Sequence, residues 1–334
     1  MHGVQRNRSF SDVAQEALAQ ISKHCSQLNQ QKWRSTIVQR YNEVQLIIDN
    51  DLFLITPDRR STRLNSVQQL SLIQMLCTYF NEKEVEPHSF QYANFETIFC
   101  GREGETLLHE IRISILQKLC SLALQYPCYS LFILVATWLH KIGNSRPYAQ
   151  EFIGYLVNHF VCGPSNLNLH LYLMPLGEKA EEFAAYFVTY AVTLTTIKSV
   201  LMSVLEYWLC ENESSRILAV IREKPIIAKF FADNTFGALI VYDCLVGESS
   251  RTALHGIISE VFVNWPDNPP LQLFPSIKES AAKQMELNGD VLRYHVHLAL
   301  KRGYMTKKDI SDFLESPDMR LRFNCLLEFC DETI

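Results

Sequence analysis

Glycine and proline are scarce in this sequence of 334 residues, which contains only 12 of each. Collagen-like and low-complexity chains need far more of both residues and are therefore excluded. Charged residues are also few, at 20%, and nearly balanced, with 31 Lys and Arg against 36 Asp and Glu. Because 48% of the residues are hydrophobic and the formal net charge is -5, the chain is not intrinsically disordered. A dedicated nucleic-acid-binding protein is disfavoured too, since it needs clustered cations to neutralise phosphates.

The ten cysteines include no pair with C-x-x-C spacing, which excludes the usual zinc-ribbon and thioredoxin signatures. Most of them lie in apolar segments, as Cys120 and Cys210 do, where a free cysteine behaves as a small hydrophobic residue. The polar N-terminus has no apolar segment typical of a signal peptide. We therefore expect free thiols and a reducing compartment, either the cytosol or the nucleus.

Two uncharged stretches, residues 119–140 and 152–177, could be mistaken for membrane spans. A spanning helix needs about 20 predominantly apolar residues. Both stretches contain polar residues, and each is interrupted by a proline, Pro127 or Pro164. We therefore expect pairs of shorter buried helices that meet at the proline, and no membrane insertion.

The motifs that would identify an enzyme are missing. The sequence has no Gly-rich nucleotide-binding motif, no G-x-S-x-G and no H-E-x-x-H. His159, Cys162 and His170 are ligand types that suit zinc, but a structural site needs four ligands and no fourth is evident. His295 and His297 fall on different faces of a helix, which predicts one half-buried and one solvated side chain. We expect no catalytic residue, metal or cofactor.

Helix-start signals recur along the chain. Ser66-Val-Gln-Gln69 has the form of a capping box, and the apolar residues after it predict one buried face made of Val67, Leu70, Ile73, Leu76 and Phe80. Further helix starts are expected at Ser276, at Thr306 and at Ser316-Pro317. Other helices are predicted near residues 105–126, 129–142, 147–161, 179–195, 197–210, 235–246, 249–263 and 289–302. The fold class is therefore all-α.

Short connections between successive helices favour antiparallel hairpins, and a row of such hairpins forms an α-solenoid. Because no fixed sequence period is visible, any repeat must be degenerate and HEAT-like. Three prolines within residues 264–270 cannot continue a helix. We therefore predict a solenoid over residues 1–263, a Pro-rich connecting loop at 264–271 and a C-terminal helical unit at 272–334, packed on the solenoid.

Two features suggest contacts with a partner protein. Trp265 is an anchor-type residue in the proline-stiffened loop. The densest basic cluster contains Arg59, Arg60 and Arg63, which could bind an acidic partner or phosphate. Asp49, Asp51 and Asp58 flank this cluster, so a merely solvated loop is the competing interpretation.

Residues 63–80 carry a specific likeness. Their Arg63-Leu-Asn-Ser66 opening and their Cys77-Thr-Tyr-Phe80 end resemble a helix of the Integrator complex subunit 15 family. Further similar segments follow in the family's order: Leu116–Leu119, Ala136–Leu139, Glu206–Leu209, Lys224–Ala228, Ala299–Gly303 and Lys308-Asp309. The likeness extends from about residue 60 to the end and is weaker between 230 and 290.

The resemblance implies a non-enzymatic α-helical scaffold in the nuclear Integrator complex. Such a subunit links the accessory module of subunits 10, 13 and 14 to the core, in RNA polymerase II transcription regulation and snRNA 3'-end processing. It implies other Integrator subunits as partners, no direct nucleic acid, and a nuclear location with or without a cytoplasmic pool. A cytoplasmic helical adaptor, for example in trafficking, stays open as the alternative, as does an all-α enzyme whose site no motif marks.

Overall fold

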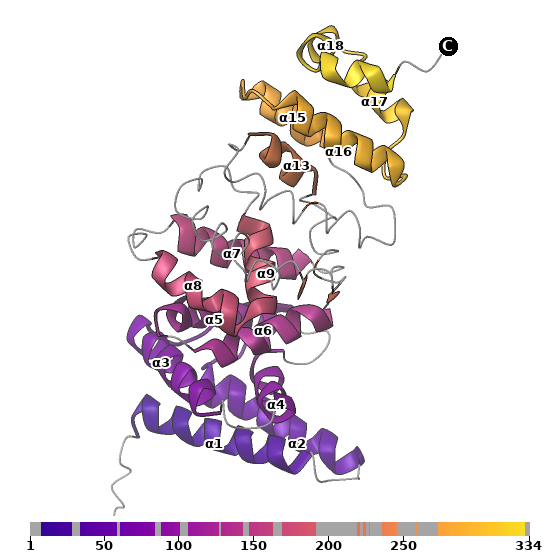
Figure 1. The fold of residues 1–334 in the computed structure, drawn as a ribbon. Coiled ribbons are helices and arrows are strands. Elements are labelled where there is room, and N and C mark those ends of the chain that lie inside the picture. The colour runs from indigo at the N-terminus through magenta and orange to yellow at the C-terminus, as the bar shows by residue number, and fades with distance from the viewer. Residues whose placement is uncertain are drawn as a thin grey trace, which may run out of the picture. The chain divides into compact units, whose positions relative to one another are not determined.

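The computed structural model describes residues 8–28, 34–58, 61–83, 88–100, 106–126, 128–142, 147–162, 169–191, 236–245 and 273–330, together with positions 219–220, 223–224, 227 and 258. These residues are overwhelmingly helical (Figure 1). The only β feature among them is an isolated antiparallel bridge between Ile55 and Thr62. The predicted all-α class is confirmed. The chain forms two compact units, residues 1–138 and 139–334, and each is described by itself.

The N-terminal unit is a set of packed helices. Its helices are α1 (Phe10–Leu28), α2 (Arg34–Ile47), the π-helix η1 (Ile48–Leu52), α3 (Ser66–Glu82), α4 (His88–Phe99), α5 (Thr106–Gln125) and most of α6 (Tyr129–Ile142). Helix α3 packs on α1 and α5, and α4 packs on α1 and α5. Four fully buried rings with neighbouring centroids 5.2 to 6.3 Å apart form the aromatic centre, namely Phe53, Phe80, Phe95 and Phe99.

The C-terminal unit contains two sets of packed helices. In the first, α7 (Pro147–Cys162) and α8 (Leu169–Lys179) both pack on α9 (Glu181–Ala191). In the second, α13 (Phe236–Leu245) packs on α15 (Leu273–Ala282) and α16 (Gly289–Lys301). The short helices α17 (Lys307–Phe313) and α18 (Pro317–Arg322) pack on the 3-10 helix η5 (Asn324–Phe329), and so does α16.

Two predicted helix starts are wrong, one by a single residue and the other by four. Helix α3 is capped by Asn65, not Ser66: the Asn65 side chain accepts from the Gln68 amide, and the Gln68 side chain accepts from the Asn65 amide. Helix α15 begins at Leu273 rather than after Ser276. Pro275 is tolerated there because it lies in the first turn, where its missing amide would have no intrahelical partner.

The C-terminal helix starts are confirmed. Thr306 caps α17 through a capping box with Asp309. Ser316 is the N-cap of α18 with Pro317 at the first helical position, although its side chain makes no capping hydrogen bond. His295 and His297 lie on different faces of α16 as predicted, but His295 is fully buried rather than half-buried.

The two uncharged stretches form helix pairs as predicted. The first divides between α5 and α6, and the second between α7 and α8, with Pro127 and Pro164 lying between the described segments. No helix in the described parts is long and apolar enough to cross a membrane. The helices predicted at 197–210 and 249–263 and the Pro-rich loop at 264–271 fall outside the residues just defined, apart from Ile258. The three-part domain division therefore stays a prediction.

Candidate interaction surface on helices α1 and α3

A groove of about 900 Å³ runs along α1 and α3 in the N-terminal unit. This volume lies within the range of known ligand sites, which is about 300 to 1,000 Å³. One wall is α1, the other is α3, and α4 contributes Phe90. The lining residues are mostly small or polar, with Leu18, Met75, Tyr79 and Phe90 as the larger apolar members.

The side of α3 that faces away from the core carries both polar and apolar side chains, and it forms one wall of the groove. Its buried residues are Leu72, Ile73, Leu76, Cys77 and Phe80. By contrast, Val67 is 77% exposed and Leu70 is 51% exposed, so the predicted single apolar face is wrong at its first two members. A helix turns about 100° per residue, so side chains three residues apart point in directions that differ by about 60° around the helix axis. Val67 therefore lies on the same side of α3 as Ser71, Gln74 and Thr78, three residues that line the groove.

Helix α1 contributes small side chains to the same groove. Its buried face consists of Ala14, Ala17, Leu18, Ile21 and Cys25. The neighbouring stripe of Ala19, Ser22 and Ser26 lines the groove at three- to four-residue spacing. Because these side chains are short, they leave room between the two helix backbones.

Hydrogen bonds fix the two walls to each other and to α4. The hydroxyls of Ser11 and Ser71 lie 3.2 Å apart. Tyr79 donates its hydroxyl hydrogen to Asn94 Oδ1 at 2.8 Å and also bonds the Ser22 side chain. Burial raises the pKa of Tyr79 above its ordinary value. The phenol therefore stays neutral, and its ring is held as a fixed part of the groove wall.

The groove has a slight positive charge. Its lining includes Lys23, Lys83 and Glu82, which sum to +1, whereas the whole chain carries -5. The Lys83 ammonium lies 5.9 Å from the Tyr79 ring centroid and 5.4 Å from that of Phe90. Lys23 adjoins Ser22 on α1, so both cations flank the Ser22–Tyr79 contact. This end of the groove therefore favours acidic groups.

Arg63 lies at the base of a short loop that leads into α3. The Ile55–Thr62 bridge closes this loop, and the Arg63 amide donates to the Leu54 carbonyl at 2.8 Å. Leu54 has a φ of 46°, a left-handed conformation that few non-glycine residues adopt. The Arg63 side chain is exposed and precedes the first residue of α3 by three positions. Arg59 and Arg60 lie outside the described residues.

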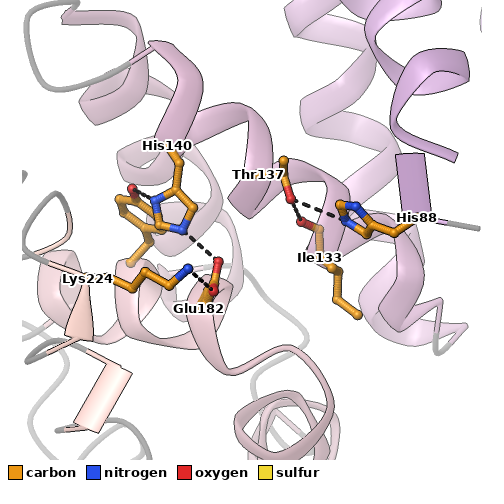
Figure 2. A network of polar contacts seen from close by, with 7 residues as sticks. His88, Ile133, Thr137, His140, Glu182 and Lys224 are labelled. Atoms are coloured by element: carbon orange, nitrogen blue, oxygen red, sulfur yellow. Dashed lines mark hydrogen bonds and ion pairs between the residues drawn. The ribbon is translucent and has the colours of Figure 1, made fainter. Parts of the chain in front are cut away.

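A polar network in the C-terminal unit offers the best case for acid–base chemistry (Figure 2). His140 Nε2 lies 2.6 Å from Glu182 Oε2, and His140 Nδ1 lies 2.9 Å from the Tyr186 hydroxyl. Lys224 Nζ lies 3.1 Å from the other oxygen of Glu182. The hydrogen bond from His140 lowers the pKa of Glu182 to about 2, and Lys224 contributes in the same direction.

This network holds helices together and contains no activated nucleophile. A neutral imidazole satisfies both contacts if Nε2–H donates to Glu182 and Nδ1 accepts from Tyr186. Burial raises the pKa of Tyr186, which keeps its phenol protonated. His88 Nε2 lies 3.4 Å from the Thr137 hydroxyl, a contact of exposed side chains that is also drawn in Figure 2. Because a nucleophile needs an adjacent base or a lowered pKa, the geometry supports a positioning role.

The Cys77 thiol and His159 are two further groups that could take part in chemistry. Burial raises the pKa of the Cys77 thiol to about 12, so it stays protonated. The described residues contain no group of three or more metal-ligand side chains. His159 is exposed and stacks on Tyr155 with ring centroids 6.0 Å apart.

Comparison with known proteins decides the family. A sequence model of the Integrator complex subunit 15 family matches residues 2–221, which is 220 of the 334 residues. The chain belongs to the Integrator complex subunit 15 family. Integrator complex subunit 15 of Mus musculus is 24% identical over 156 residues, which cover 46% of this chain and 33% of the mouse protein. The chain thus aligns with about a third of that relative.

The family match includes all of α1, α3 and α4, and therefore every residue that lines the groove. The sequence likeness at residues 63–80 had pointed to α3, and the groove shows which side of α3 is open. Sequence reasoning missed the α1 wall because its small and polar residues resemble any solvated helix face. Trp265, like Arg59 and Arg60, lies outside the described residues, so Arg63 is the one predicted partner-binding residue within the described part of the chain.

Proposed function

We propose that this chain is a non-catalytic scaffold subunit of the nuclear Integrator complex. The family match over residues 2–221 carries this proposal. We propose more specifically that the chain links the accessory module of subunits 10, 13 and 14 to the core, in RNA polymerase II transcription regulation and snRNA 3'-end processing. The open groove on α1 and α3 and the absence of an activated nucleophile in the His140 network support a binding role.

The proposed architecture is a row of degenerate HEAT-like hairpins with a C-terminal helical unit. Short connections between consecutive helices, as between α8 and α9, support it. The C-terminal helices also offer a partner surface: α18 buries no residue, and Leu321 is 80% exposed. Trp265, Arg59, Arg60 and Arg63 are the proposed contact residues in the loops.

Affinity purification of the tagged full chain from nuclear extract, followed by mass spectrometry, tests the proposal. We expect recovery of Integrator subunits, including 10, 13 and 14. Trp265→Ala and a combined Arg59, Arg60 and Arg63 to Ala variant should each reduce that recovery. Glu279→Ala is the control, because Glu279 is exposed and its ion pair among the described residues is with Lys283, one helical turn away.

Failure to recover any Integrator subunit with well-expressed wild-type chain would overturn the assignment. Exclusion of the chain from the nucleus would instead favour the cytoplasmic adaptor. Strongly salt-dependent binding of RNA by the purified chain would revive direct nucleic-acid recognition.

A further inference from the structure

We infer that the α1/α3 groove binds an amphipathic helix of another Integrator subunit, with apolar residues on the groove floor and an acidic residue at the Lys23 end. This inference rests on the proposed function for the identity of the complex. It goes further by assigning the surface, the secondary structure of the bound segment and its charge.

The shape of the groove suits a third helix. Ala19, Ser22 and Ser26 on one wall, and Ser71 and Thr78 on the other, project only short side chains into it. Helices pack at interaxial distances of about 8 to 10 Å, and short side chains at the contact allow the closer end of that range. A helix laid in such a groove uses residues at i, i+3, i+4 and i+7 as anchors.

The groove also provides an apolar floor. Leu18 is 5% exposed at its base, and Met75, Tyr79 and Phe90 line it. Methionine adapts its shape to a partner because it is unbranched and polarizable. Beyond the groove, Val67 continues the same stripe of α3 with 77% of its surface exposed. A bound helix of two to three turns would therefore cover apolar surface that the N-terminal unit leaves open.

The charge of the groove lining favours an acidic partner. The groove lining sums to +1 on a chain of net charge -5, and both of its lysines flank the Ser22–Tyr79 contact. An acidic side chain at this end of the groove would meet the exposed Lys23 and the ammonium of Lys83, which lies over the Tyr79 and Phe90 rings. A second copy of the chain would present a groove of the same sign, so a groove-to-groove dimer is disfavoured. The geometry therefore points to a different protein with an acidic amphipathic helix.

Groove-filling and charge-reversal variants of the full chain test the inference. Ala19→Trp places a large ring in the groove, and Gln20→Trp is its control, because the neighbouring exposed Gln20 does not line the groove. Lys23→Glu reverses the charge, and Lys301→Glu is its control, because Lys301 is an exposed lysine on α16, far from the groove in sequence. We expect Ala19→Trp and Lys23→Glu to lower recovery of one Integrator subunit about tenfold or more, as for hot-spot residues. The controls should stay within about twofold.

A photo-crosslinking residue at Gln74 then identifies the bound segment. We expect an adduct with the same subunit, within a segment that has helical apolar spacing and at least one acidic residue. Changing that acid to Lys should restore binding to Lys23→Glu at the expense of wild type. Should Ala19→Trp fail to fold by circular dichroism, the surface substitution Lys23→Glu and the adduct carry the test.

The outcomes separate this inference from the proposed function. If wild type recovers Integrator subunits and both groove variants recover them equally, the groove assignment is wrong and the proposed function stands. An adduct at Gln74 with a second copy, with a segment lacking acidic residues or with no protein at all also overturns it. If wild type recovers no Integrator subunit, the proposed function fails, and so does the identity of the partner named here.

Discussion

The ion pair between Arg112 and Asp49 gives the sharpest test of what stabilises the N-terminal unit. Arg112 lies on α5 with a side chain 1% exposed, and its Nη2 donates to Asp49 Oδ1 at 2.8 Å. Asp49 lies in the π-helix η1 and is 13% exposed. The guanidinium carbon also lies 5.9 Å from the Phe53 ring centroid. The two partners are therefore unequally buried, and their removal should have unequal costs.

The expected magnitudes follow from that asymmetry. Asp49→Ala leaves a buried guanidinium without its carboxylate, which should cost about 3 to 5 kcal/mol. Arg112→Met leaves a carboxylate that water can reach, and methionine fills much of the vacated volume, so about 1 to 2 kcal/mol is expected. The double variant contains no unpaired buried charge. It should therefore be more stable than Asp49→Ala alone, although it carries one more substitution.

Hydrogen exchange of backbone amides in α5 and η1, measured on the full chain by mass spectrometry, reads out these differences locally. Each 1.4 kcal/mol corresponds to a factor of ten, so Asp49→Ala should accelerate exchange roughly a hundredfold or more. If Arg112→Met accelerates exchange as much as Asp49→Ala, or if the double variant exchanges faster than both single variants, the reasoning from unequal burial is refuted.

Three further predictions concern other polar contacts. His295→Ala should lower the free energy of unfolding, measured by chemical denaturation, by about 3 to 5 kcal/mol, because it breaks a fully buried pair with Asp243 on α13. The control His297→Ala changes an exposed residue of the same helix and should stay within about 0.5 kcal/mol of wild type. Equal costs for the two variants would contradict this prediction. Asn65→Ala should lower stability by about 1 kcal/mol and Ser66→Ala by less, which distinguishes the two cap positions. Glu182→Gln should lower the Tm at pH 7, and the deficit should vanish as pH falls from about 4.5 towards 2, since the folded pKa is depressed to about 2; a deficit that persists at pH 2 would argue against it.

Helix positions were largely predictable because their ends are marked locally. The expected helix at 129–142 is α6 itself, and those near 147–161 and 235–246 match α7 and α13 within about one residue at each end. The start of α3 was less certain because Asn65 and Ser66 are both good cap residues, each followed three residues later by glutamine. Only the backbone decides, through the extended conformation of Asn65 at φ -74° and ψ 169°.

The candidate site was less predictable because it depends on which faces meet. The spacing of Val67, Leu70 and Ile73 suggested one apolar face, but the angular drift of the helix moves Val67 off that face, and the packing of α3 on α1 and α5 leaves both Val67 and Leu70 exposed. Likewise, nothing in the sequence pairs Arg112 with Asp49, which are 63 residues apart. Contacts between distant segments follow from the fold, and a local pattern does not contain them.

Stability and binding should be separable in the N-terminal unit. Its interior is fixed by the four-ring aromatic centre and by the Arg112–Asp49 pair, and none of these residues lines the groove. Substitutions more than about 7 to 10 Å apart, with no shared partners, usually act additively. A groove variant such as Lys23→Glu should therefore lower partner recovery and leave the exchange rates in α5 unchanged. Asp49→Ala should accelerate exchange in α5 and leave unchanged the binding contacts made by the exposed residues of the groove. Such a division would suit the proposed scaffold role, since the surface can then be specific for a partner while the core is maintained independently.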